Sequence, residues 1–194
     1  MDMKPLMSVF LLIVMAATTF LSHPVQADSA LIVKAGSFKL SDDTQGISSG
    51  VSLMFDEDAS SVFAIEYEWG IDKVVLGGEL LGYSNDWDSS VATSGDNDTL
   101  AIMFNVKRYF EIHKSIEFYI GGGIGIASVD FDGPSGSATG DDLALQVMAG
   151  VTVRAKKVGL YTEVKSFSSE PEDEFGDDID VSGTGLFGGI SFHF

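Results

Sequence analysis

The sequence has 194 residues, no cysteine and a formal net charge of −18, from 11 basic and 29 acidic side chains. The absence of cysteine excludes a disulfide framework. The strong acidity excludes a nucleic-acid partner, because too few cations remain to neutralise phosphates.

Residues 1–27 are predicted to be a secretory signal that is cleaved after Ala27. Lys4 precedes an apolar run over residues 6–17, and a small-residue pair, Val25 and Ala27, follows it; this is the order of an export signal. The run is shorter than the about 20 residues of a transmembrane helix. No cysteine follows it, which excludes a lipoprotein anchor. We therefore expect a mature domain over residues 28–194.

The mature part shows period-two alternation, which is typical of strands with two different faces. In residues 143–154, six alternate positions from Leu143 to Val153 are apolar, while the other parity includes Gln146 and Arg154. Segments of this kind predict eight strands in all. They are 30–40, 62–69, 73–83, 100–107, 116–129, 143–154, 158–167 and 182–194.

The connections between these segments alternate between short and long. Short turns alternating with long Gly-, Ser- and Asp-rich loops predict an up-and-down antiparallel meander, the pattern of transmembrane barrels. Acidic side chains gather in the long connections 41–58, 84–98, 130–142 and 168–183, which contain no lysine or arginine. Lys73, Lys114, Lys156 and Lys157 lie in the short ones. The two ends of the barrel should therefore differ in charge.

A soluble, lipocalin-like barrel would alternate too, with its apolar parity inward. A membrane barrel is favoured because the less apolar parity carries mid-strand charges of both signs, which can pair inside a narrow lumen. These residues are Glu66, Glu68, Glu79, Lys107, Glu117, Arg154, Glu163 and Lys165. Glycines on the same parity, at positions 121, 123 and 125, should make room for Tyr119 and Arg154 in an eight-stranded interior. Aromatic residues near the turn end predict an interfacial girdle, namely Trp69, Tyr109, Phe110 and Phe194.

The last strand carries the most specific signal. The chain stops at Phe194, and Phe192, Ile190 and Leu186 share its parity. With the Tyr-Ile-Gly-Gly-Gly-Ile-Gly stretch at 119–125, this pattern resembles the small outer-membrane β-barrels of the opacity, OmpX and OmpA-like type. The resemblance implies that the barrel-assembly machinery recognises these four residues as an assembly signal. It also implies insertion into the bacterial outer membrane from the periplasm.

We predict no catalytic residue and no cofactor. The enzymatic alternative is a lipid A-modifying barrel, which needs a nucleophile and a base within hydrogen-bond reach near the outer leaflet. Ser191 and His193 share a face, with Glu163 as a possible orienting acid, but they fall at the periplasmic end. His113 falls in a periplasmic turn. The strand parity suggests a polar lumen floor for the Ser191–His193 pair.

The acidic loops and the charged lumen each suggest a binding or transport role. Acidic groups such as Asp96 to Asp98, Asp130 with Asp132, and Asp173 to Asp180 offer oxygen ligands for a divalent cation, but none has the spacing of a calcium loop. We therefore assign no metal. An eight-stranded lumen filled by charges predicts no sizeable conductance, with a narrow channel as the alternative. The expected function is a non-enzymatic structural or surface-interaction role, in contact with lipopolysaccharide and with host or surface ligands through the loops.

Overall fold

The computed structural model of the chain describes residues 29–41, 44–46, 52–55, 60–71, 73–89, 94–133, 136–170 and 180–194. The expected signal segment, residues 1–27, lies outside the described residues, as does the acidic segment 171–179. In the part of the chain that is described, no helix has the length and apolar character needed to cross a membrane.

Eight long strands form the barrel. They are β1 (Ser29–Leu40), β4 (Ser60–Ile71), β5 (Val74–Ser89), β6 (Ser94–His113), β7 (Ile116–Gly133), β8 (Gly136–Ala155), β9 (Val158–Ser168) and β10 (Gly183–His193). Two short strands, β2 (Thr44–Gly46) and β3 (Ser52–Phe55), lie between β1 and β4 in the chain. They pair with each other, and β3 also pairs with the far end of β5.

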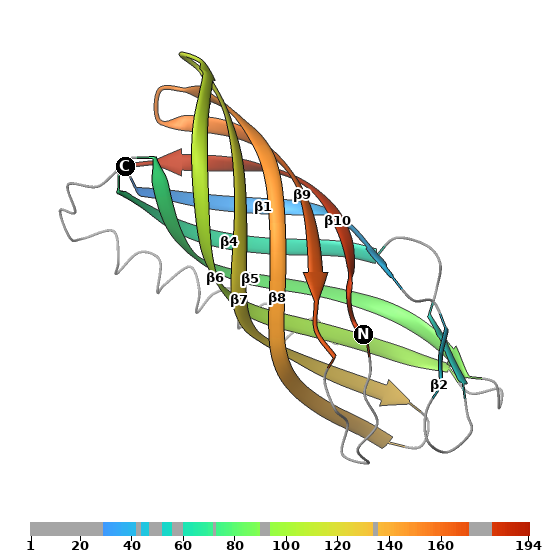
Figure 1. Cartoon of the computed structure of the whole chain (residues 1–194). Helices are drawn as coiled ribbons and strands as arrows, with labels where there is room; N and C mark the ends of the chain where they lie inside the picture. The colour runs from blue at the N-terminus through green and yellow to red at the C-terminus, as the bar shows by residue number, and fades with distance from the viewer. Residues whose placement is uncertain are drawn as a thin grey trace.

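The sheet closes on itself because β1 pairs with both β4 and β10, and β5 pairs with β6. All these pairings are antiparallel, so the predicted eight-stranded up-and-down barrel is confirmed (Figure 1). Following the register once around the barrel from Ala30 leads back to β1 at Leu40, a shear of ten residues (40 minus 30). The path is Ala30, Glu68, Gly77, Asn105, Gly123, Gln146, Phe167, Gly183 and Leu40. Such a stagger accompanies a strand tilt of about 35–45°.

One end of the barrel carries the tight turns. Two residues each join β6 to β7 and β8 to β9. Lys156 in the second turn has a φ of 59°, the left-handed conformation that two-residue hairpin turns require. The amide of Phe194 donates to the carbonyl of Ser29 at 2.9 Å, so β1 begins where β10 ends. This turn end lies opposite β2 and β3 (Figure 1).

Two of the predicted long loops are mostly hairpin extensions. Asp88 on β5 still pairs with Ser94 on β6, and Gly133 on β7 pairs with Gly136 on β8. The sequence did not predict these extensions, because the alternation of apolar and polar residues ends before them. Hydrogen bonds between the backbones of paired strands continue there and do not depend on the side chains. The pattern marks only the part of a strand that has one apolar face.

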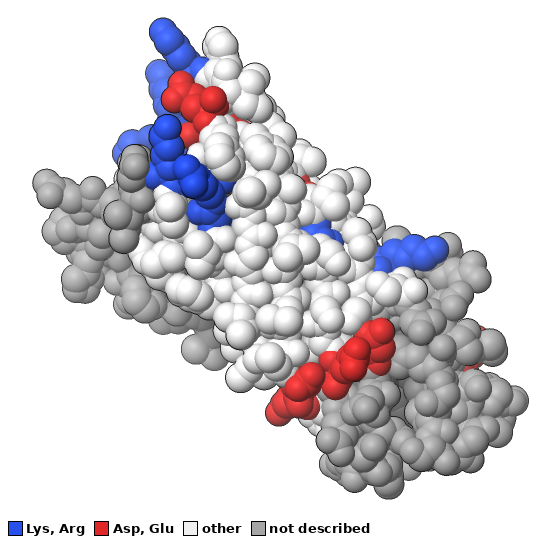
Figure 2. All heavy atoms as spheres, in the orientation of Figure 1, with Lys and Arg blue, Asp and Glu red and all other residues white. Residues whose placement is uncertain are grey.

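The strands place their apolar parity outward. Large apolar side chains are exposed on all eight barrel strands, with Phe63 at 66%, Ile102 at 65% and Leu160 at 65% exposure. Figure 2 shows a flank that is largely free of charge. Basic atoms gather at the turn end with some acidic atoms among them, and acidic atoms with some basic ones lie toward the opposite end. A contiguous apolar surface of this kind on a monomer marks an interaction face.

Candidate functional site

Seven charged side chains meet in the middle of the lumen, and we call them the lumen network. They are Lys34, Glu66, Glu68, Glu79, Lys107, Glu163 and Lys165, and each residue is 5% exposed or less. They come from β1, β4, β5, β6 and β9. Strand alternation positions them, because each lies on the parity opposite to the exposed apolar residues of its strand.

Lys34 is central to this network. Its Nζ lies 2.7 Å from Glu66 Oε2, 2.9 Å from Glu79 Oε1 and 3.1 Å from Glu163 Oε1. All four side chains are fully removed from solvent. A buried ammonium requires such pairing, since an unpaired charge away from water is very costly.

The other two lysines connect the remaining carboxylates. Lys107 Nζ lies 2.6 Å from Glu66 Oε2 and 2.8 Å from Glu68 Oε1. Lys165 Nζ lies 2.6 Å from Glu79 Oε1 and 3.6 Å from Glu163 Oε1. Four carboxylates therefore face three ammonium groups, and the lumen network links strands on opposite sides of the barrel.

Neutral donors satisfy the additional oxygen atoms of the network. Asn105 Nδ2 donates to Glu66 Oε1 at 2.9 Å, and Gln146 Nε2 donates to Glu79 Oε2 at 2.8 Å. The hydroxyls of Tyr119 and Tyr161 both donate to Glu163 Oε2, at 2.9 Å and 2.5 Å. The Tyr109 hydroxyl lies 3.1 Å from both oxygens of Glu68. Hydrogen bonding of this density is what allows buried charges to persist.

The structure brings together six of the eight residues expected in the lumen network. Glu117 and Arg154 form a separate pair at 2.9 Å near the turn end, with their side chains 26% and 34% exposed. Lys34 was missed, because both parities of residues 30–40 mix apolar and polar residues. The predicted lumen residues include five acidic side chains and only three cations. This imbalance could have indicated that a further cation, such as Lys34, faces the lumen.

Several interior glycines leave space for large polar neighbours. A methyl group on Gly150 would run into the Tyr119 hydroxyl, and one on Gly123 would run into the side chains of Asn105 and Gln146. The space that Tyr119 needs is therefore provided by Gly150 on β8.

Tyr109 was expected in the outer girdle, and that prediction was wrong. It points inward and packs on Tyr119 with ring centroids 5.0 Å apart, because a phenol hydroxyl inside finds the Glu68 carboxylate.

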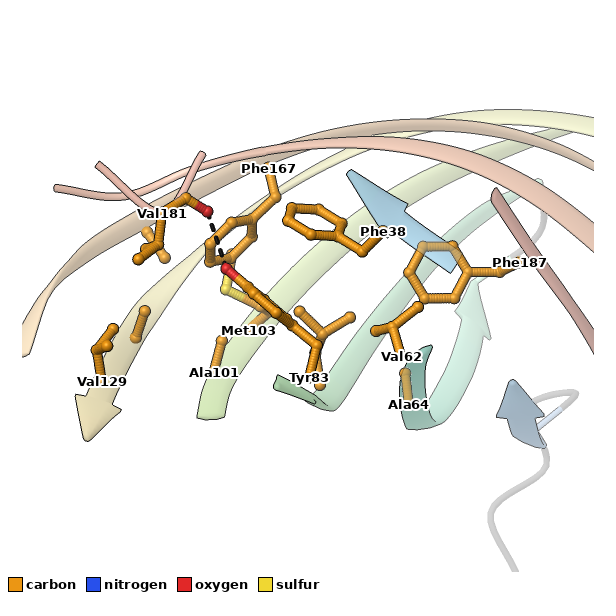
Figure 3. Packing of buried hydrophobic residues seen from close by; sticks show 13 residues of the cluster. Phe38, Val62, Ala64, Tyr83, Ala101, Met103, Val129, Phe167, Val181 and Phe187 are labelled. Carbon is orange, nitrogen blue, oxygen red and sulfur yellow. Dashed lines mark hydrogen bonds between the residues drawn. The ribbon is translucent and has the colours of Figure 1, made fainter. Parts of the chain in front are cut away.

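An apolar plug fills the lumen between the network and the loop end. It consists of Phe38, Val62, Ala64, Leu81, Tyr83, Ala101, Met103, Ala127, Val129, Ala144, Phe167, Val181 and Phe187 (Figure 3). The Tyr83 hydroxyl donates to the carbonyl of Val181 at 2.8 Å. This bond ties the segment just before β10 to the opposite wall of the barrel.

The turn-end floor of the lumen holds the serine–histidine pair that the sequence singled out. Ser191 Oγ lies 3.0 Å from His193 Nε2, and Ser191 is 1% exposed. Glu163 lies four residues beyond Gly159, the residue that pairs with Ser191, and its carboxylate contacts the lysines of the lumen network. Ser191 is therefore buried and hydrogen-bonded to the half-buried His193, while the Glu163 carboxylate belongs to the lumen network.

The loop end and the last strand carry the remaining candidate residues. Asp98 accepts a hydrogen bond from Ser84, and Asp130 accepts one from Thr139 at 2.8 Å. Among the described residues, no group of three or more acidic or histidine side chains could hold a metal ion. On β10, the expected assembly signal faces outward. Leu186, Ile190, Phe192 and Phe194 are each 41–55% exposed.

Comparisons with known proteins bear on the fold. A scan against protein-family models and a search of curated proteins each found no match. Among solved structures, Neisserial surface protein A is 15% identical, with a TM-score of 0.64 over 86% of this chain and 97% of that one. OprG from Pseudomonas aeruginosa is 14% identical, with a TM-score of 0.64 over 87% and 96%. The attachment invasion locus protein Ail of Yersinia pestis is 14% identical, with a TM-score of 0.55 over 88% and 100%.

This chain has the fold of small outer-membrane β-barrels. The match extends over nearly the full length of each of these three structures. The resemblance expected from residues 119–125 and the last strand is thereby confirmed at the level of fold.

Proposed function

We propose that the protein is a non-enzymatic barrel integral to a bacterial outer membrane, with its acidic loops outside the cell. The observation that carries this proposal is the inverted distribution of side chains. Large apolar residues surround the barrel, while seven charged residues are buried within it. A soluble barrel would bury the apolar parity instead. The outer-membrane proteins of the same fold support the location.

The orientation can be tested with single cysteines, because the chain has none of its own. Ser94→Cys lies at the loop end and Lys157→Cys at the turn end, and both positions are exposed. A membrane-impermeant maleimide should label Ser94→Cys on intact cells and Lys157→Cys only after the outer membrane is permeabilised. Equal labelling of both variants on intact cells would contradict the proposed orientation.

We assign the specific role to the external loops and propose adhesion to a host or environmental surface, or maintenance of the envelope. Loops on a rigid scaffold usually carry the binding function of a fold. The apolar plug and the lumen network leave the barrel itself without an evident substrate path. Among the structures of this fold, the Yersinia protein is named for attachment and invasion, which favours a surface role.

Adhesion and envelope maintenance make different predictions for the loops. In a deletion strain, a barrel in which residues 171–179 are replaced by a short Gly-Ser linker should restore resistance to detergent if the barrel maintains the envelope. The same variant should fail to restore attachment to immobilised surface ligands if the loops bind them. Full attachment by the linker variant would exclude this loop as the binding element.

The proposed partners follow from the two ends of the barrel. Lipopolysaccharide would contact the loop end, where divalent cations can bridge acidic side chains to phosphates. The barrel-assembly machinery would recognise Leu186, Ile190, Phe192 and Phe194. Replacing Phe194 with serine should reduce the folded fraction in cells while leaving refolding from urea into detergent unchanged. Equal loss in both settings would indicate a purely structural role for Phe194.

An enzymatic role and a channel role each have a direct test. A lipid A-modifying enzyme would release acyl chains from lipopolysaccharide and lose this activity in Ser191→Ala. We expect no release, since Ser191 is buried at the turn end.

A narrow channel would give steady open events in planar bilayers. We expect none, because the apolar plug fills the lumen above the network.

A further inference from the structure

Arg108 is a cation on the apolar outer face of the barrel. It lies on the outward parity of β6, between Val106 and Phe110, and is exposed. Its register partners on the neighbouring strands are Val74 on β5 and Ile120 on β7. All four neighbours are 39–48% exposed, so the guanidinium projects from a hydrophobic surface near the turn end.

No carboxylate among the described residues forms an ion pair with Arg108. Its guanidinium carbon lies 5.4 Å from the centroid of the Phe110 ring, and Phe110 packs on Phe118 with centroids 6.1 Å apart. The Phe110 ring lies against the cation, and the guanidinium donors have no hydrogen-bond partner among the described residues. Arg154, by contrast, is paired with Glu117 at the same end of the barrel.

A second cation lies beside Arg108. The amide of Tyr109 donates to the carbonyl of Lys73 at 3.0 Å, which brings the β4–β5 turn against this part of β6. Lys73 is exposed and has no carboxylate partner among the described residues. Lys73 directly precedes Val74, the register partner of Arg108, so two cationic residues lie at adjacent register positions at the turn end. We call this surface, made of Lys73, Arg108, Phe110 and Phe118, the Arg108 patch.

We propose that the Arg108 patch binds the phosphate of an anionic phospholipid in the periplasmic leaflet, with the acyl chains along Val106 and Ile120. This inference rests on the proposed membrane location. An arginine on the lipid face is strongly destabilising at the bilayer midplane and is tolerated near the interfaces. A phosphate there supplies the missing anion, and arginine binds phosphate through two parallel hydrogen bonds. Two cations at adjacent register positions, neither with a carboxylate partner among the described residues, favour a lipid with a net negative charge over a zwitterionic one.

The test compares phosphatidylglycerol with phosphatidylcholine. Native mass spectrometry of the refolded, delipidated barrel in detergent measures the dissociation constant for the first bound lipid of each kind. A cation beside an anionic lipid contributes about 1 kcal/mol, which corresponds to about fivefold in affinity. Arg108→Gln and Lys73→Gln should each weaken phosphatidylglycerol binding about fivefold and leave phosphatidylcholine binding unchanged.

Lys39→Gln is the matched control, because Lys39 is an exposed lysine at the loop end of β1. It should leave the phosphatidylglycerol affinity at the wild-type value. Equal affinity of the wild type for the two lipids would overturn the inference. So would an equal loss in Lys39→Gln and Arg108→Gln, which would indicate a general charge effect.

Insertion into phosphatidylcholine vesicles, followed by heat-modifiable gel mobility, tests the membrane barrel independently. If the wild type inserts but shows no preference for phosphatidylglycerol, the barrel stands and the Arg108 patch is refuted. If it does not insert into any vesicle, the proposed membrane location itself fails.

Discussion

Replacing Lys34 with methionine tests whether the lumen network holds the barrel together. The variant keeps an unbranched side chain that is one atom shorter, and it removes the ammonium that contacts Glu66, Glu79 and Glu163. Four buried carboxylates would then share Lys107 and Lys165 alone. Because the three carboxylates that contact Lys34 do not reach water, solvation does not replace the lost attraction.

The expected cost follows from this burial. Breaking a fully buried ion pair from one side costs about 3–5 kcal/mol, since a charge remains without its partner. Arg154→Met is the control, because its pair with Glu117 is about one third exposed. Solvent screens that pair, so we expect a loss of about 0–1 kcal/mol. The sequence had placed Arg154 in the network, whereas the structure gives it a separate, partly exposed pair and assigns the large effect to Lys34.

The assay is unfolding in urea from phosphatidylcholine vesicles, with tryptophan fluorescence and gel mobility as two readouts. A double variant, Lys34→Met with Glu163→Gln, removes one negative charge as well and should recover part of the lost free energy of unfolding. If Lys34→Met and Arg154→Met differ by less than about 1 kcal/mol, or if the double variant is less stable than Lys34→Met, electrostatic pairing does not explain the network.

Three further changes probe separate parts of the barrel by the same unfolding measurement. Gly150→Ala should destabilise the barrel by about 1–3 kcal/mol, because the new methyl group displaces Tyr119. Ile102→Arg should cost about 2–4 kcal/mol in vesicles, because position 102 faces outward in the apolar belt. Tyr83→Phe should cost about 1 kcal/mol, because the Val181 carbonyl loses its buried donor.

Each of these predictions has a contrasting outcome. Gly78→Ala should be nearly neutral, since an added methyl group there meets nothing within 4 Å. A cost at Gly78 equal to that at Gly150 would point to backbone effects instead of a clash with Tyr119. For Ile102→Arg, an unchanged stability in vesicles would mean that this face does not contact lipid. For Tyr83→Phe, an unchanged stability would mean that the bond to Val181 contributes nothing to holding the segment before β10.

The sequence predicted the barrel strands well because burial on one face imposes a period of two. Residues 143–154 and 100–107 carry that signal strongly, and both lie within long strands. The hairpin extensions before Leu100 and before Leu143 were not predicted, because backbone hydrogen bonds form there without an apolar face. Strands β2 and β3 were missed for a similar reason, since three and four residues are too few to show a period.

The lumen residues were harder to predict because parity identifies a face but not a height along the barrel. Glu117 and Arg154 share the inward parity with Glu163, yet they meet near the turn end, separately from the network. The shear of ten residues decides which inner positions share a level, and no single strand encodes it. Tyr109 is an error of a different kind, because it concerns the face. It shares the inward parity of Lys107, but its place near a turn favoured the outer girdle.

Different parts of this barrel determine its stability and its proposed function in the external loops. The lumen network and the apolar plug occupy the interior, so the interior serves mainly to hold eight strands in one register. The outer wall is apolar and positions the barrel, with the Arg108 patch near its turn end. The interior and the outer wall thus each contribute to the stability and placement of the barrel. Changes in the loop-end segments should therefore alter surface interactions without altering the free energy of unfolding. This independence is what allows the loop variant and Lys34→Met to be read as separate tests of function and fold.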